Sequence, residues 1–228
     1  MRILKNIALI SCLATVLFSC DKFFNTPSPL QHRDYFPLNS GSYIEYDVME
    51  ITHDELSSIK SDTSRYLLRC EIQDSFMDNS GRIAWEYVRF KRSNTNQNWT
   101  QSDLWTINLA DNKAQTVEEN QRMVKLVFPI GPLTLWDANQ FNTDPKLTCR
   151  YDKIHEPLTM NGFSFDSTLR VEQENSRNLL IFRRKYEVYA NKVGLIKKYY
   201  KDLNISNFDT LNIRSGKEIY MTLIGYGE

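Results

Sequence analysis

The stretch TSRYLLRCEIQ at residues 63–73, followed by DNSG at 78–81 and RIAWEYVRFKR at 82–92, decides the fold class. In the first segment apolar side chains alternate with polar ones from Tyr66 to Ile72, which is the two-residue period of a half-buried strand. The DNSG tetrapeptide is a typical turn sequence, and the second segment follows it as a partner strand. The stretch therefore predicts an antiparallel hairpin.

The same interpretation extends along the chain, because no segment keeps a helical period over three turns. Turn residues at 161–162 and across 174–178 predict breaks between strands. The many short gaps and the high content of Tyr, Phe and Trp indicate an all-β fold, an antiparallel sheet that is barrel-like, with a two-sheet β-sandwich as the alternative. The further segments that fit strands are 44–48, 103–109, 123–130, 147–154, 167–173, 179–189, 193–201 and 218–224.

The N-terminal segment has the pattern of an export signal. Arg2 and Lys5 form a basic start, and an apolar run follows at 7–18 that is short for a transmembrane helix. The run ends in LFSC at 17–20, which resembles the cleavage site of bacterial lipoproteins. That resemblance implies cleavage before Cys20 and attachment of lipid to its thiol and new amino end. The alternative is a plain secretory peptide with a chance cysteine.

Three parts of the chain follow from this pattern. Residues 1–19 are the expected signal peptide, and residues 20–34 are the lipidated cysteine and a flexible tether. Pro27 and Pro29 favour an extended chain in the tether. Residues 35–228 are expected to form a single antiparallel β domain, long enough to bury one sizeable core.

The charge balance excludes one class of partner. The chain has 28 Lys and Arg against 28 Asp and Glu, and no basic cluster stands apart from opposite charge. A neutral chain lacks the electrostatic footprint of a nucleic-acid-binding protein. We therefore expect no nucleic acid as a partner. The expected partners are the membrane, through the lipid, and an envelope protein, glycan or lipid ligand.

Two cysteines remain for the domain, because Cys12 lies in the signal and Cys20 carries lipid. Cys70 and Cys149 each share the phase of apolar neighbours, so both are expected to point inward. If their strands adjoin, a disulfide can link them; otherwise they are two buried thiols.

A search for catalytic and metal-binding motifs finds almost nothing. The chain has no HExxH helix, no phosphate-binding glycine loop and no GxSxG elbow. We expect no cofactor and no metal, and we interpret His155 and Glu156 as a solvated charge pair. Glu45 and Asp47 share a strand face about 7 Å apart, a separation compatible with paired-carboxylate hydrolysis. Their face is opposite the apolar one, so it is most simply the wet face of the sheet.

Aromatic side chains are the other candidates for a ligand site. Trp85, Tyr87, Trp99 and Trp105 are able to line a sugar or lipid site, and core packing is the alternative. Trp99 stands out because it follows the polar run at 93–98, where an aromatic ring has little local core to join.

Three motifs carry a resemblance to a known group. They are YFPLNSG at 35–41, KLVFP at 125–129 and EVYANKVGLI at 187–196, and they resemble uncharacterised lipoproteins of Bacteroidetes-type bacteria. The group has no established activity. The resemblance implies a lipid anchor in the outer membrane, with the domain on its periplasmic or cell-surface face. This chain departs from the group where Asn191 and Lys192 replace a usual glycine, and near Leu133.

A second resemblance concerns modification. The tripeptides DST at 166–168 and DTL at 209–211 resemble O-glycan acceptor sites of exported proteins in such bacteria. The resemblance makes Ser167 and Thr210 candidate O-glycosylation sites.

Three functions remain open at this point. The favoured one is a non-catalytic, lipid-anchored envelope protein that binds a partner, a glycan or an apolar ligand. The second is a surface polysaccharide hydrolase that uses Glu45 and Asp47. The third is a lipid-binding carrier or chaperone.

Overall fold

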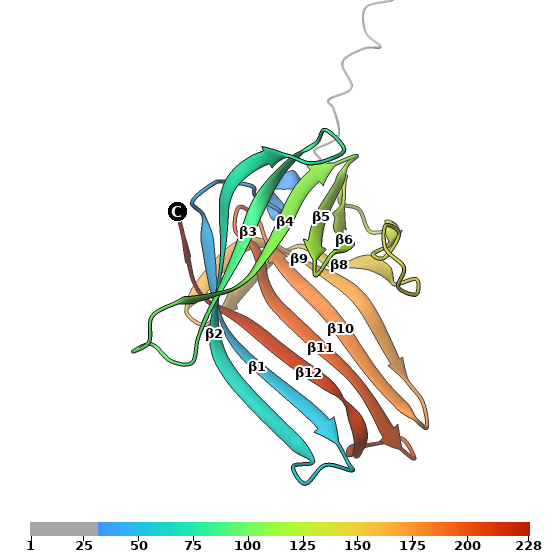
Figure 1. Ribbon diagram of the computed structural model, residues 1–228. Coiled ribbons are helices and arrows are strands. Elements are labelled where there is room, and N and C mark those ends of the chain that lie inside the picture. The colour runs from blue at the N-terminus through green and yellow to red at the C-terminus, as the bar shows by residue number, and fades with distance from the viewer. Residues whose placement is uncertain (1–31) are drawn as a thin grey trace, which may run out of the picture. The chain divides into compact units, whose positions relative to one another are not determined.

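Twelve antiparallel strands form one sheet in the computed structural model, which describes residues 32–228 (Figure 1). The predicted signal peptide, Cys20 and most of the predicted tether lie outside the described residues. The elements are η1 (Arg33–Tyr35), β1 (Tyr43–Asp54), β2 (Ser61–Met77), β3 (Ile83–Arg92), β4 (Thr100–Ala110), β5 (Lys113–Glu118), β6 (Gln121–Val127), β7 (Leu135–Asp137), β8 (Thr148–Met160), β9 (Phe163–Arg177), β10 (Ile181–Ala190), β11 (Gly194–Ser206) and β12 (Asp209–Gly227).

Strand order explains how the sheet curls. Hairpins run from β1 to β6 in one direction and from β12 back to β7 in the other. The first and last strands, β1 and β12, pair with each other in the middle of the sheet, along the whole of β1 and from Ser215 to Gly227 of β12. The result is a nearly closed, barrel-shaped sheet, so the all-β, antiparallel, barrel-like prediction is confirmed. The strands form one sheet and not the alternative, a sandwich of two sheets.

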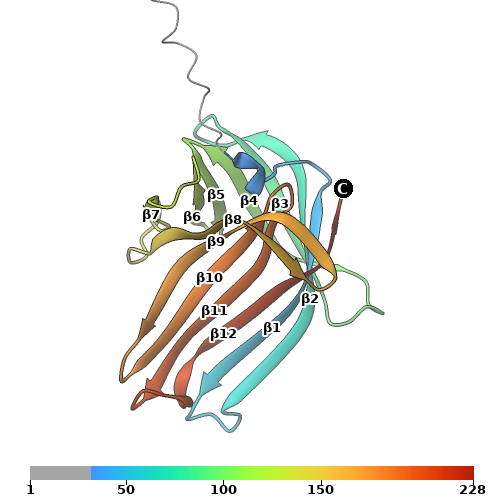
Figure 2. The ribbon, with the colours of Figure 1, turned by 180° about the vertical axis from the view of Figure 1, so that it is seen from behind.

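The strands are long enough to reach beyond the curled part. Figures 1 and 2 show β3 to β6 curled over one end of the sheet, while the far ends of β1, β2 and β9 to β12 extend away from it. We call this second part the extension. Register shifts, such as the one between Ile72 and Ser75 in β2, interrupt the regular pairing and bend the strands.

Two buried clusters stabilise the curled part. One includes Tyr35, Leu126 and Tyr189, and the other includes Tyr46 and Leu68, all of them almost inaccessible to solvent. Burial of each large apolar side chain contributes about 1.5–3 kcal/mol. The compact unit Gln31–Glu228 contains every strand and both clusters, so it holds the contacts that stabilise the sheet.

The hairpin predicted from 63–73 and 82–92 is present as β2 and β3, joined by a turn at DNSG. The alternation is also confirmed, because Leu68, Cys70 and Ile72 are buried.

Two strands and one turn differ from the sequence prediction. Strand β5 occupies a polar segment, and β7 has only three residues, too few to show a period. The turn predicted across 174–178 is wrong, because β9 continues to Arg177 and the chain turns at Asn178 instead. Glu174 stays in the strand because it forms cross-strand ion pairs, the shorter at 2.9 Å to Lys185 Nζ.

Candidate functional site

The interior of the curled part contains a cavity of about 110 Å³. Its walls come from strands on both sides of the β1–β12 pair, so it exists only because the sheet curls. Most of the wall is apolar because each strand directs alternate side chains inward. The apolar side chains that line it include Phe36, Ile44, Leu68, Ile72, Ile107, Val193, Leu195 and Met221.

A second cavity of about 250 Å³ adjoins the first. It extends to Tyr43 and Tyr226, near the C-terminal end of β12. The two cavities share one wall, which is made of Pro37, Ile44, Cys70, Ile72, Tyr87 and Val193. The two cavities are therefore neighbours along these side chains.

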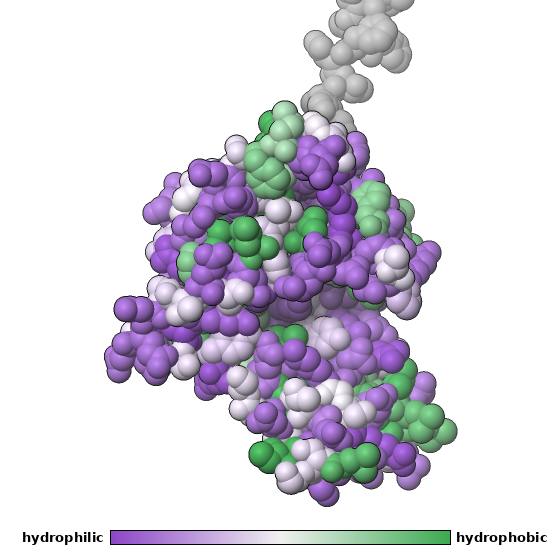
Figure 3. Space-filling model, viewed as in Figure 1, coloured by the Kyte–Doolittle hydropathy of each residue, from purple (hydrophilic) through white to green (hydrophobic). Residues whose placement is uncertain are grey.

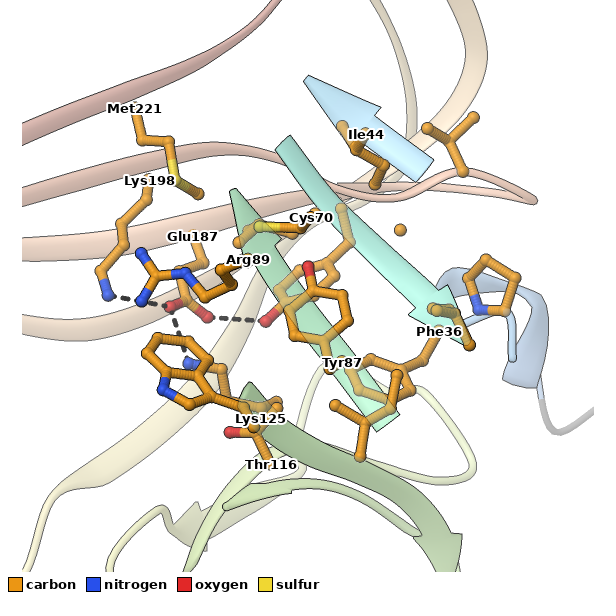
Figure 4. Close-up of a pocket in the computed structure, with 18 of the residues that line it drawn as sticks. Phe36, Ile44, Cys70, Tyr87, Arg89, Thr116, Lys125, Glu187, Lys198 and Met221 are labelled. Carbon is orange, nitrogen blue, oxygen red and sulfur yellow. Dashed lines mark hydrogen bonds and ion pairs between the residues drawn. The ribbon is translucent and has the colours of Figure 1, made fainter. Parts of the chain in front are cut away.

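Charged side chains close one side of the first cavity, as Figure 4 shows. Lys125 of β6 lies at the centre, with its Nζ 3.3 Å from Glu118 Oε1 and 3.1 Å from Glu187 Oε1. Tyr189 donates a hydrogen bond of 2.6 Å to the other oxygen of Glu187. Two further cations complete this set, which we call the charged cluster: Arg89, Glu118, Lys125, Glu187 and Lys198.

Neighbouring charges keep the centre of the cluster ionised although it is buried. Burial disfavours the charged form of Glu187, but Lys125 and Lys198 outweigh it and lower its pKa. Burial acts against Glu118 in the same way, and the same two lysines lower its pKa to about 2. Burial would lower the pKa of Lys125, but the two glutamates raise it. All three groups therefore carry charge at neutral pH.

Arg89 of β3 is held beside this centre by two contacts. Its Nη1 lies 3.3 Å from Asp103 Oδ2, and its guanidinium lies 3.9 Å from the centre of the Trp105 ring. Its buried Nε has no hydrogen-bond partner among the described residues. The guanidinium therefore has a fixed orientation and an unused donor.

The structure brings together two of the four predicted aromatic site residues. Tyr87 and Trp105 line the first cavity. Trp85 of β3 lines neither cavity. Trp99 does not line them either; it is half-buried, with the Arg92 guanidinium 4.1 Å from its ring centre.

The charged cluster was not predicted from the sequence. Lys198 also belongs to it and points into the cavity (Figure 4). A signal was present, because Lys125 and Glu187 each stand within apolar runs, in VKLVF and YEVYA. A charge flanked in this way is a candidate for a buried ion pair.

The two predicted inward-facing cysteines are buried in different clusters. Cys70 lies on the wall shared by the cavities, and Cys149 packs in the other cluster. The described residues contain both as free thiols, with no bridge between them. Burial raises the pKa of both, against the opposing effect of Arg89 at Cys70, and the pKa of Cys149 reaches about 12.

The candidate O-glycosylation sites lie outside the cavities. The Ser167 hydroxyl is half-buried and lies 2.7 Å from Tyr35 Oη, with which it shares a hydrogen bond. Thr210 is half-buried near the start of β12.

The two carboxylates considered for hydrolysis do not form a cleft. Asp47 is paired with Arg65, and Glu45 lies 3.5 Å from Arg69 Nη1, on the opposite face of β1 from buried Tyr46. A surface pocket beside Asp47, Arg65 and Tyr66 does not include Glu45. Residues 32–228 contain no group of His, Cys, Asp and Glu arranged to hold a metal ion. They also include no helix with the length and hydropathy that crossing a bilayer requires.

Exposed apolar side chains gather at the hairpin ends of the extension, visible as green atoms at the lower end of Figure 3. None of them lines the two cavities. They are Leu56, Ile59, Leu179, Leu180, Phe208 and Leu211.

Comparisons with known proteins give one weak structural likeness and no family. No protein-family model matches the chain, and no curated protein matches it. One solved structure with some similarity is that of a protein from Parabacteroides distasonis ATCC 8503, described provisionally as a lipoprotein. The sequence identity is 13%, the TM-score is 0.38, and the match covers 85% of this chain and 98% of the other. At this TM-score the likeness carries no argument about fold or function.

Proposed function

We propose that this protein is a non-catalytic, lipid-anchored envelope protein that binds a small apolar or amphipathic molecule inside its curled sheet. The observation that carries this proposal is an apolar cavity that is closed on one side by the charged cluster and shares a wall with a second cavity. Ligand sites are typically apolar clefts in which a few polar groups fix the orientation. A hydrocarbon group that enters the cavity leaves water, which favours binding.

The size of the site limits the ligand. The two cavities measure about 110 and 250 Å³, and typical small-molecule pockets measure about 300–1,000 Å³. A ligand must therefore use both cavities and still be slender. A single short aliphatic chain fits this requirement better than a sugar ring or a lipid with two chains.

The proposed location in the cell envelope is based on the sequence. The export signal that ends at Cys20 supports a lipid anchor in the envelope, and the resemblance of the three motifs supports the outer membrane. A binding role is favoured over hydrolysis because Glu45 and Asp47 are held in separate ion pairs with arginines.

A larger side chain on the wall shared by the two cavities is expected to weaken binding of a neutral aliphatic probe. We would titrate the unit Gln31–Glu228 with 1-decanol by isothermal calorimetry, expecting saturable binding to one site. Ile72→Phe places a larger ring between the two cavities, so its affinity should fall about tenfold. Ile83→Phe is the matched control, because Ile83 is 54% exposed and lines neither cavity.

Two results would contradict the proposal. One is the absence of saturable binding to the unaltered unit. The other is an equal affinity for the Ile72→Phe and Ile83→Phe variants, which would place the bound alcohol elsewhere. Circular dichroism would verify that both variants keep the β fold.

A further inference from the structure

The cations that line the first cavity are paired unequally. Arg89, Lys125 and Lys198 supply three positive charges, and Glu118 and Glu187 supply two negative ones. Lys125 Nζ pairs with Glu118 at 3.3 Å and with Glu187 at 3.1 Å. Lys198 Nζ lies farther away, 4.0 Å from Glu187. Arg89 has its counter-charge in Asp103, outside the cavity wall. Lys198 is therefore the weakly paired cation of the wall, and Arg89 lies beside it (Figure 4).

Arg89 also keeps an unused hydrogen-bond donor. Its Nη1 lies 3.3 Å from Oδ2 of Asp103, which is not part of the cavity wall. Its Nε is buried without a partner among residues 32–228. An unpaired buried donor is unfavourable, so an acceptor brought by a ligand would relieve it. Stacking on Trp105 at 3.9 Å fixes the guanidinium in place for that acceptor.

We propose that the ligand is an aliphatic monocarboxylate, whose carboxylate lies between Arg89 and Lys198 and whose chain follows the apolar wall past Ile72. This inference rests on the proposed function and names the chemical class of its ligand. A guanidinium matches the geometry of a carboxylate, and an ionised acceptor makes a stronger hydrogen bond than a neutral one.

Other head groups fit the cavity less well. A cationic head would be repelled by Arg89 and Lys198, and a neutral alcohol would give them a weaker acceptor than an ionised group. A phosphate head carries more negative charge than the weakly paired Lys198 balances. A single carboxylate pairs with Lys198 and gives Arg89 Nε an acceptor.

The test compares three probes that differ only in the head group: decanoate, 1-decanol and decylamine. We would titrate the unit Gln31–Glu228 with each at about pH 7.5, where decanoate is ionised and decylamine is protonated. Decanoate is expected to bind about tenfold more tightly than decanol, and decylamine more weakly than decanol.

Arg89→Met should remove the advantage of decanoate over decanol. Arg92→Met is the matched control, because Arg92 lies on the same strand, stacks on Trp99 at 4.1 Å and lines neither cavity. It should keep the full preference for decanoate. If Arg89→Met does not fold, Lys198→Met takes its place and should also reduce the preference.

The outcomes separate the two proposals. Equal affinities for decanoate and decanol would overturn the carboxylate inference while the binding function stands. Binding of none of the three probes would overturn both. A decanoate preference that survives in both Arg89→Met and Lys198→Met would also overturn the inference.

Discussion

Replacement of Lys125 with methionine is expected to lower the free energy of unfolding by about 3–5 kcal/mol. The side chain of Glu187 is only 1% exposed, and that of Glu118 is 18% exposed, so both carboxylates would lose their central partner within a buried site. An ionised group left unpaired in such a site retains its desolvation penalty without the compensating attraction. Urea denaturation of the unit Gln31–Glu228 would measure the change.

An exposed ion pair provides the matched control. Lys217 Nζ lies 2.9 Å from Glu50 Oε2, but the lysine side chain is 46% exposed. Lys217→Met should therefore cost no more than about 1 kcal/mol. The double variant Lys125→Met with Glu187→Gln should recover part of the loss, because it removes the buried negative charge. If Lys125→Met costs no more than Lys217→Met, the cluster is not the buried ionic centre described above.

Acid is expected to destabilise the protein through the same cluster. The pKa of Glu118 is about 2 in the folded protein, against an ordinary value of 4.5, because Lys125 and Lys198 outweigh its burial. As pH falls, the unfolded chain binds this proton first. The contribution of Glu118 is therefore complete above about pH 4.5 and is lost as pH falls toward 2. Its size is on the order of 3 kcal/mol.

Stability curves between about pH 6 and pH 2.5 would measure this effect. Glu118→Gln should flatten the acid limb of the curve, because the variant has no proton to bind at that position. Glu55→Gln is the control, since Glu55 is exposed in the turn after β1 and should leave the acid limb unchanged. Acid limbs of the same steepness in Glu118→Gln and the unaltered unit would contradict the assignment.

Local pattern was sufficient to predict the fold class. The alternation at 63–73 and the DNSG turn specify β2 and β3, because one face of that hairpin is buried and a one-residue slip would expose it. The polar segment of β5 could not be recognised in this way, since it is held by its neighbours β4 and β6 more than by its own hydrophobic period.

The candidate site was predictable only in part. Tyr87 and Trp105 were suggested by aromatic chemistry and lie in the cavity. The contact of Lys125 with Glu187 could not be predicted, because it joins residues 62 positions apart. It depends on the pairing of β1 with β12, which joins the two halves of the sheet, and on the curl that brings β6 near β10. Unusual charges within apolar runs were the only local sign of it.

The central claim is that a ligand lies inside the curled sheet, and the reactivity of Cys70 tests it most directly. In the unit Gln31–Glu228 with Cys149→Ser, Cys70 is the one remaining cysteine, and it lies on the wall shared by both cavities. We would measure its rate of modification by methyl methanethiosulfonate with and without saturating 1-decanol. The account predicts that decanol slows modification about tenfold, because the chain covers the thiol. An unchanged rate at saturation would mean that the alcohol binds elsewhere and would contradict the account.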